Sequence, residues 1–112
     1  MKEDPIATIE TILDRATTSW DGMRLESYPS GKPAFTMQIM TIPPHSKMHR
    51  HSHDIMQLGY ILSGELTITT DSGETTSFQA GEPAIEVVGK IHYGENRGDV
   101  DTVVLVVSIL SE

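Results

Sequence analysis

Residues 51–64, "HSHDIMQLGYILSG", place two histidines one residue apart directly before an apolar run that ends at a glycine. Side chains alternate along an extended chain, so His51 and His53 can project to the same face. Their Cα atoms would then lie roughly 6.5–7 Å apart, which lets both rings bind one ion at about 2.1 Å. A further histidine, His92, follows the apolar segment "VVGKI" and is a candidate third ligand. The stretch therefore indicates part of a metal site beside a β-strand.

The rest of the chain has the residue preferences of an all-β protein. Sequences such as "YPSGKP", "DSGE" and "NRGD" are typical of turns and separate segments rich in Ile, Val, Thr and aromatic residues. We expect strands within five segments: 34–42, 57–70, 75–80, 84–88 and 101–110. Short strands with turns at intervals of roughly ten residues predict a sandwich or a small barrel.

The segment 5–20 is ambiguous. Ile6, Ile9 and Leu13 fit the apolar stripe of a helix, but Ile and Thr dominate the segment and both are β-branched. We expect an N-terminal strand that ends near residues 20–22.

Composition excludes several classes of protein. The 112 residues suffice for one domain, and the formal net charge of −8 argues against a nucleic-acid partner. No apolar run is long enough to span a membrane, and residues 1–13 are too acidic for a secretory signal, so we expect a cytoplasmic protein. Cysteine is absent, so a metal would be held by histidine, carboxylate or amide groups.

Two segments are apolar on both faces of their expected strands. In 55–62, Ile55 and Ile61 share one face, while Met56, Leu58, Tyr60 and Leu62 share the other, and 103–110 repeats the pattern. Such strands must be covered on both sides, either by the N-terminal arm or by a second subunit. We favour a homodimer, with cover from within the chain as the alternative.

Two histidine segments together resemble the cupin family. Residues 45–64 follow the first cupin motif, G-x5-H-x-H-x3–4-E-x6-G, and residues 81–96 follow the second, G-x5-P-x-G-x2-H-x3-N. The resemblance is to small single-domain members, and it implies a jelly-roll, a double-stranded β-helix barrel. It also implies one cupin domain over 1–112. Residues 34–110 would form the barrel with both motifs, after an N-terminal arm and first strands in 1–33.

The motif match assigns the metal ligands that the resemblance implies. His51, His53 and His92 occupy the histidine positions, and Gln57 stands where the family has a glutamate. Gln57 could bind the ion directly, bind it through water, or orient a neighbour. Three imidazoles and an amide would leave a divalent ion its full charge, so we expect weaker retention and stronger Lewis acidity than with a glutamate.

Other positions depart from the motifs or add to them. His45 replaces the first glycine and Val87 replaces the proline, while His49 lies outside the motif, so we expect His45 and His49 to lie outside the site. Glu86 could be a general base, a metal ligand that compensates for Gln57, or an outward-facing residue. Tyr93 is a second candidate for moving protons.

The resemblance implies a divalent transition metal, and ligation by nitrogen and oxygen alone suits Fe, Mn, Ni, Co, Cu or Zn. We expect a metal-dependent enzyme, dioxygenase-like, that acts on a small anionic or oxygenated organic molecule. The alternatives are a non-catalytic module that binds or senses a small molecule, and a metal-dependent lyase or isomerase.

Overall fold

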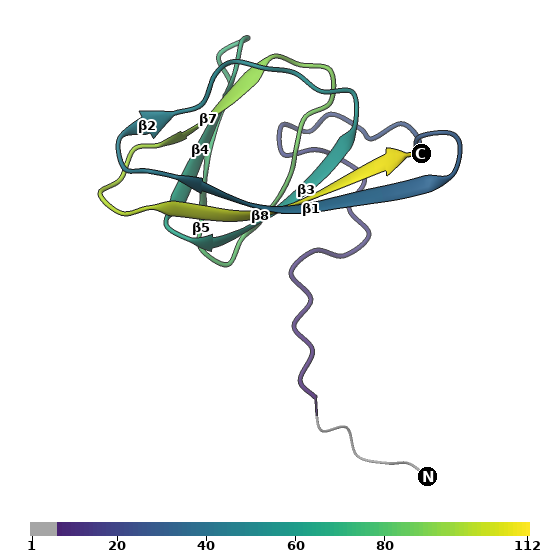
Figure 1. Ribbon diagram of the computed structural model, residues 1–112, viewed down its shortest axis with the longest axis horizontal. Coiled ribbons are helices and arrows are strands. Elements are labelled where there is room, and N and C mark those ends of the chain that lie inside the picture. The colour runs from purple at the N-terminus through teal and green to yellow at the C-terminus, as the bar shows by residue number, and fades with distance from the viewer. Residues whose placement is uncertain (1–6) are drawn as a thin grey trace.

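The computed structural model describes residues 7–112, which form two four-stranded antiparallel sheets (Figure 1). The first sheet has the order β1-β8-β3-β6, formed by Pro33–Ile42, Thr102–Ser111, Met56–Ser63 and Pro83–Ile85. The second has the order β2-β7-β4-β5, formed by Ser46–Lys47, His92–Asn96, Glu65–Thr70 and Thr75–Gln79. The described residues contain no helix, and so none that could cross a membrane.

The expected all-β jelly-roll is confirmed. The chain passes repeatedly from one sheet to the other, and the inward side chains of both sheets meet in one core. The buried members of that core are Ile42, Ile61, Leu66, Ile68 and Val104. The barrel consists of two facing sheets rather than one continuously hydrogen-bonded cylinder.

Most expected strands lie close to their observed bounds, with two differences. The apolar run 57–70 is divided into β3 and β4, because Gly64 turns the chain from one sheet into the other with a φ of +78°. The segment 84–88 is extended only in β6, which ends at Ile85. The chain leaves the sheet immediately before Glu86.

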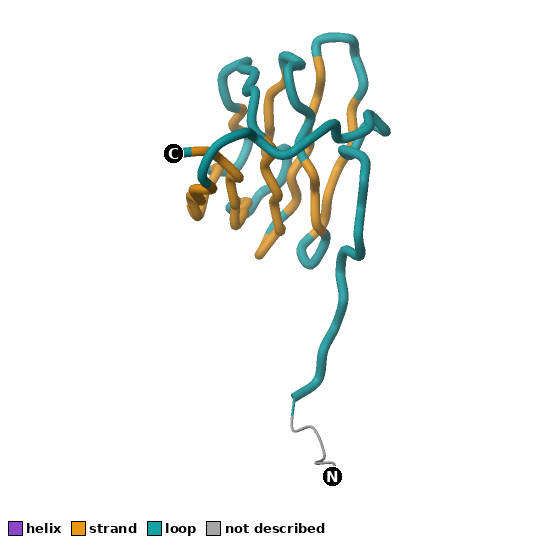
Figure 2. The backbone as a smooth tube through the Cα atoms, turned by 90° about the vertical axis from the view of Figure 1, so that its right-hand side faces the viewer, coloured by secondary structure: helices purple, strands orange, loops and turns teal. Residues whose placement is uncertain are grey.

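The expected N-terminal strand is wrong. Among residues 7–32 there is only an isolated bridge between Thr18 and Arg24, and residues 5 and 6 lie outside the described part of the chain. Figure 2 shows this arm as a loop that runs along the sheets and away from them. A preference for extended backbone makes a strand only where another strand offers hydrogen bonds, and the arm does not align with one.

The arm is anchored beside β6 by its residues 19–21. The backbone N–H of Trp20 donates to the carbonyl of Ile85 at 2.9 Å, and its ring meets Phe78 edge-on with centroids 6.3 Å apart. The buried carboxylate of Asp21 forms an ion pair with Lys90. The arm therefore holds the 86–91 loop that leads to His92.

Candidate metal centre

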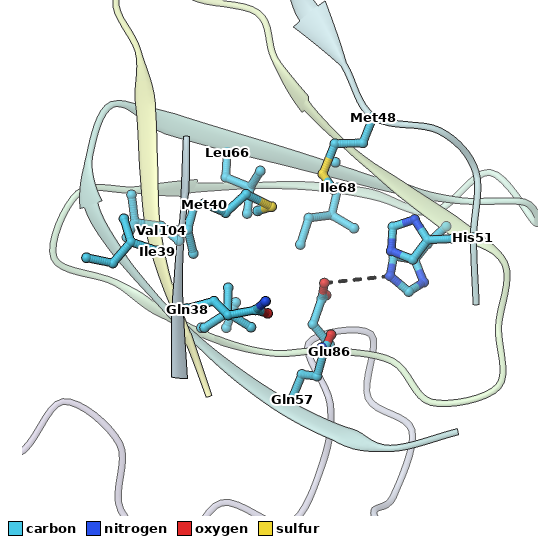
Figure 3. Close-up of a pocket in the computed structure, with 16 residues that line it drawn as sticks. Gln38, Ile39, Met40, Met48, His51, Gln57, Leu66, Ile68, Glu86 and Val104 are labelled. Carbon is cyan, nitrogen blue, oxygen red and sulfur yellow. Dashed lines mark ion pairs between the residues drawn. The ribbon is translucent and has the colours of Figure 1, made fainter. Parts of the chain in front are cut away.

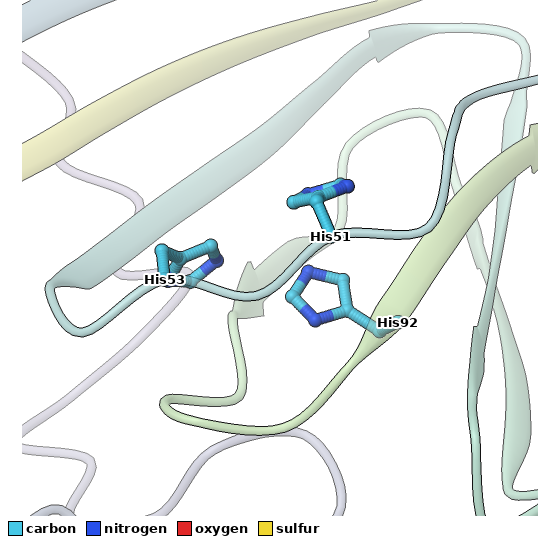
Figure 4. A group of neighbouring side chains, drawn as sticks. All are labelled: His51, His53 and His92. Carbon is cyan, nitrogen blue, oxygen red and sulfur yellow. The ribbon is translucent and has the colours of Figure 1, made fainter.

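The structure brings the three predicted histidines together. His51 and His92 exchange backbone hydrogen bonds of 3.0 and 2.8 Å, which join the loop before β3 to the start of β7. The ring centroids of His51 and His53 lie 4.6 and 5.1 Å from that of His92 (Figure 4). One ligand atom from each ring lies within 4.8 Å of the others, so a small inward movement of the rings would let all three bind one ion.

Each imidazole is oriented by a backbone carbonyl. The Nδ1 atoms of His51, His53 and His92 contact the carbonyl oxygens of His49, Ile55 and Lys90 at 2.9, 3.0 and 2.9 Å. Because a carbonyl oxygen only accepts, the proton of each neutral ring is on Nδ1 and the lone pair is on Nε2. All three rings thus have the tautomer in which Nε2 can bind a metal.

Two of these Nε2 atoms have no ordinary hydrogen-bond partner. Those of His53 and His92 are buried, and no described residue bonds to them. Buried polar atoms are nearly always satisfied, since leaving one without a partner costs roughly 1–3 kcal/mol. Three converging neutral nitrogens therefore fit a divalent transition metal.

The charge state of the rings depends on their neighbours. Burial lowers the pKa of His53, which keeps that ring neutral. The nearby Glu86 carboxylate raises the pKa of His92, because its negative charge stabilises the imidazolium. Only a neutral ring binds a metal, so an ion and a proton compete for Nε2 of His92.

Glu86 faces the histidines. Its Oε2 atom lies 3.6 Å from Nε2 of His92, and its Oε1 atom is buried without a partner among the described residues (Figure 3). The Glu86 side chain therefore points into the molecule and not outward. Gln57 is its neighbour on β3, and the amide Nε2 of Gln57 donates to Oγ of Ser108 at 3.0 Å. The backbone N–H of Glu86 donates to the carbonyl of Gln57 at 3.0 Å, and both residues line the same cavity.

A cavity of about 390 Å³ extends from these residues between the two sheets. His51, His92, Gln57 and Glu86 line its polar end, and Gln38 adds a further amide (Figure 3). Its body is apolar, formed by Met40, Met48, Ile61, Leu66, Ile68, Val104 and Val106. No lysine or arginine among the described residues lines it. The cavity can hold a small molecule with one polar end.

The structure does not bring Tyr93 to this cavity. Tyr93 follows His92 in β7 and so projects from the opposite face of the strand. Its ring lies instead under two cations, with Lys47 Nζ 5.5 Å and the Arg50 guanidinium 5.6 Å from its centroid. Tyr93 therefore lies beside Lys47 and Arg50 rather than in the cavity, so this geometry does not support the expected role in moving protons.

The remaining histidines lie outside the cluster. His45 is exposed and contacts Asp99 at 2.8 Å, and His49 is exposed. Sequence reasoning missed Ser108, which orients Gln57. The sequence could have indicated this residue, because Ser108 is the one hydroxyl-bearing residue in the apolar run "VVLVVSIL".

Comparison with models of protein families identifies the domain that the chain contains. The family model described as "Cupin domain" matches residues 38–108, which include both histidine segments. No curated protein sequence matches the chain.

Several solved structures are similar. A predicted oxalate decarboxylase from Thermotoga maritima is 32% identical with a TM-score of 0.59, over 66% of this chain and 64% of that one. A sugar phosphate isomerase from Silicibacter pomeroyi is 26% identical with a TM-score of 0.58, over 66% and 49%. A polyketide cyclase from Streptomyces resistomycificus shares the fold at 21% identity, with a TM-score of 0.61, over 70% and 56%. The chain thus matches less than two thirds of the length of each of these three proteins.

Proposed function

The chain belongs to the cupin family, and from that premise we propose that it is a metal-dependent, dioxygenase-like enzyme acting on a small oxygenated organic molecule. The observation that carries the proposal is the arrangement of His51, His53 and His92. Their Nδ1 atoms are bound to carbonyl oxygens, and their ligand atoms converge within 4.8 Å. Facial ligation with open positions is the arrangement used by non-haem iron oxygenases.

A divalent metal held by these three imidazoles would supply a Lewis acid with positions open to an oxygen atom of the substrate. The chain's own residues do the rest. The carbonyl contacts keep the rings in one orientation, and the cavity places apolar side chains beside the polar end. Gln57 and Glu86 are the two side chains next to the histidines that offer oxygen ligands.

The cavity supports a more specific class of substrate. Its lining combines one polar end with an apolar body and contains no cationic side chain among the described residues. A carboxylate, enolate or diketone head at the metal, joined to an apolar body, suits these surroundings. A sugar phosphate would bury hydroxyl and phosphate groups against aliphatic side chains, which is unfavourable.

A metal-dependent lyase is the second candidate. The similarity to a predicted oxalate decarboxylase favours it, at 32% identity. The large apolar part of the cavity argues against oxalate itself as the substrate, because that dianion has no apolar portion to fill it. Oxygen consumption distinguishes the two candidates, since a simple decarboxylation consumes none.

The first experiment is elemental analysis of protein purified without a histidine tag or a nickel column. We expect close to one equivalent of a divalent transition metal in the wild type and a strong loss in His51→Ala. His49→Ala is the matched control, because His49 is exposed and lies outside the cluster. Equal metal contents in wild type and His51→Ala would refute the metal centre.

The second experiment measures oxygen uptake by the Fe(II)-loaded protein with diketones, catechols, thiols and uronates. We expect uptake with an apolar diketone or catechol and none with a uronate. Release of CO2 without oxygen uptake would favour the lyase. Tight retention of a ligand without turnover, whatever the metal, would favour a binding module.

We also propose a homodimer, on the support of the exposed outer face of the β1-β8-β3-β6 sheet. Phe35, Met37 and Ile39 of β1 are 69%, 70% and 66% exposed there. They continue across the sheet through their antiparallel partners Ile109, Val107 and Leu105. An apolar face of this kind is typical of a surface that a second copy covers.

A further inference from the structure

We propose that Glu86 supplies the carboxylate ligand of the metal centre, in place of the residue at the acidic position of the first motif, Gln57. The proposal rests on the proposed metal centre and adds its fourth ligand. It predicts that the carboxylate ligand comes from Glu86, directly after β6, instead of from the motif position on β3.

The pairing of β3 with β6 makes this exchange possible. Leu58 and Ile85 are register partners, and the backbone N–H of Glu86 donates to the carbonyl of Gln57 at 3.0 Å. Gln57 and Glu86 are thus cross-strand neighbours, at the spacing of about 4.8 Å between paired strands. Both line the cavity. A carboxylate at either position would therefore face the same cavity.

The distance from Glu86 to His92 suits a shared ion. Two atoms each about 2.1 Å from a metal and roughly 90–120° apart are separated by about 3.0–3.6 Å. Oε2 of Glu86 and Nε2 of His92 are 3.6 Å apart, so the two atoms can bind one ion with little movement.

Burial distinguishes Glu86 from Gln57. Oε1 of Glu86 and the Nε2 atoms of His53 and His92 are buried and without partners in the described chain. A cation at their common centre would compensate these atoms together, whereas without one a buried carboxylate oxygen is costly. The amide of Gln57 already donates to Ser108. This bond fixes the orientation of the Gln57 side chain through its nitrogen atom, whereas Glu86 offers a buried carboxylate oxygen without a partner in the described chain.

The charge of the centre follows from this assignment. With Glu86 bound, a divalent ion keeps a net charge of +1 instead of the +2 expected for three imidazoles and an amide. The centre should then retain its metal well, contrary to the expectation from Gln57 alone.

The test is titration of metal-free protein with Co²⁺, followed by visible absorption, which reports both affinity and coordination. The variants are Glu86→Gln, Gln57→Leu and the exchange Gln57→Glu with Glu86→Gln. We expect Glu86→Gln to raise the dissociation constant by at least about tenfold and to change the Co²⁺ spectrum. Gln57→Leu should stay within about twofold of wild type, and the exchange should recover most of the affinity.

The controls distinguish failure of the Glu86 proposal from failure of the proposed metal centre. Circular dichroism and the unfolding midpoint of each metal-free variant show whether it is folded, and Glu86→Gln keeps the size of the side chain. His51→Ala must lose Co²⁺ binding. If wild type binds Co²⁺ and His51→Ala does not, but Glu86→Gln binds like wild type, Glu86 is not a ligand and this proposal fails alone. Loss of affinity in Gln57→Leu would also overturn it. Binding that does not depend on His51 would instead overturn the proposed function.

Discussion

Asn96 shows how one buried side chain stabilises the region next to the site. Its Nδ2 atom donates to the carbonyls of Ile42 at 2.9 Å and Val100 at 2.7 Å, and its Oδ1 atom accepts from the N–H of Gly98 at 2.9 Å. The side chain is 1% exposed. It therefore joins the end of β1 to the loop between β7 and β8, while His92 lies at the other end of β7.

We predict that Asn96→Ala lowers the free energy of unfolding by about 2–4 kcal/mol, because three backbone groups lose their buried partner. Urea or thermal denaturation of the metal-free protein measures the change. Asn96→Asp keeps the acceptor for Gly98 but loses both donors, so it should also be destabilising. A loss below about 0.5 kcal/mol in Asn96→Ala would mean that water replaces these bonds.

Glu86 and Gln57 differ in whether the protein already provides hydrogen-bond partners for their side-chain atoms. Which of the two adjacent side chains can bind a cation depends on which one is already satisfied by the protein. The amide nitrogen of Gln57 donates to the hydroxyl of Ser108, whereas no described residue satisfies the buried Oε1 atom of Glu86.

At the level of elements, the turn at Gly64 decides how β3 and β4 are divided between the sheets. A Cβ atom at this position would lie 2.9 Å from the Cα of Thr102, and it would meet the carbonyl oxygen of Asp101 more closely still. The neighbouring atoms are backbone, so they cannot move aside easily. The φ of +78° also disfavours any residue with a Cβ.

We predict that Gly64→Ala lowers the free energy of unfolding by more than about 2 kcal/mol, from backbone strain and steric overlap together. The matched control is Gly73→Ala in the turn between β4 and β5. Gly73 has a φ of +97° but no atom within 4 Å of its Cβ position. Its variant should cost only the strain, about 1 kcal/mol. Equal losses in the two variants would show that the close approach at Gly64 is unimportant. Chemical denaturation provides both values.

On the scale of the whole molecule, the two faces of the β1-β8-β3-β6 sheet differ in exposure. The inner face packs on the second sheet and lines the cavity. The outer face has Phe35, Met37 and Ile39 exposed on β1. Pairing of two such faces would bury the apolar surface that one chain leaves in water.

We predict that the wild type sediments as a dimer and that Met37→Glu shifts it toward monomer, because a charge at the centre of this face would be desolvated without a partner. The control is Val100→Glu, since Val100 is 66% exposed but lies in the loop between β7 and β8. Analytical ultracentrifugation over a range of concentrations measures the change. A wild type that remains monomeric at high concentration would disprove the dimer.

Much of this arrangement could be predicted from residue patterns. Alternation and turn residues indicate strands close to β1, β5 and β8, and the resemblance to the two cupin motifs selects His51, His53 and His92 from five histidines. These features depend on local chemistry. The alternation of apolar residues shows which side chains can face a core. The spacing of the histidines reflects the number of residues that the chain needs to come back to the same site.

The position of Glu86 and the path of the arm could not be predicted in this way. Glu86 points inward because β6 pairs with β3 and ends one residue earlier, which sets its carboxylate beside Gln57. The arm lacks a strand because its β-branched residues align with no neighbouring strand. These features depend on contacts between distant segments, whose geometry exists only once both sheets have formed.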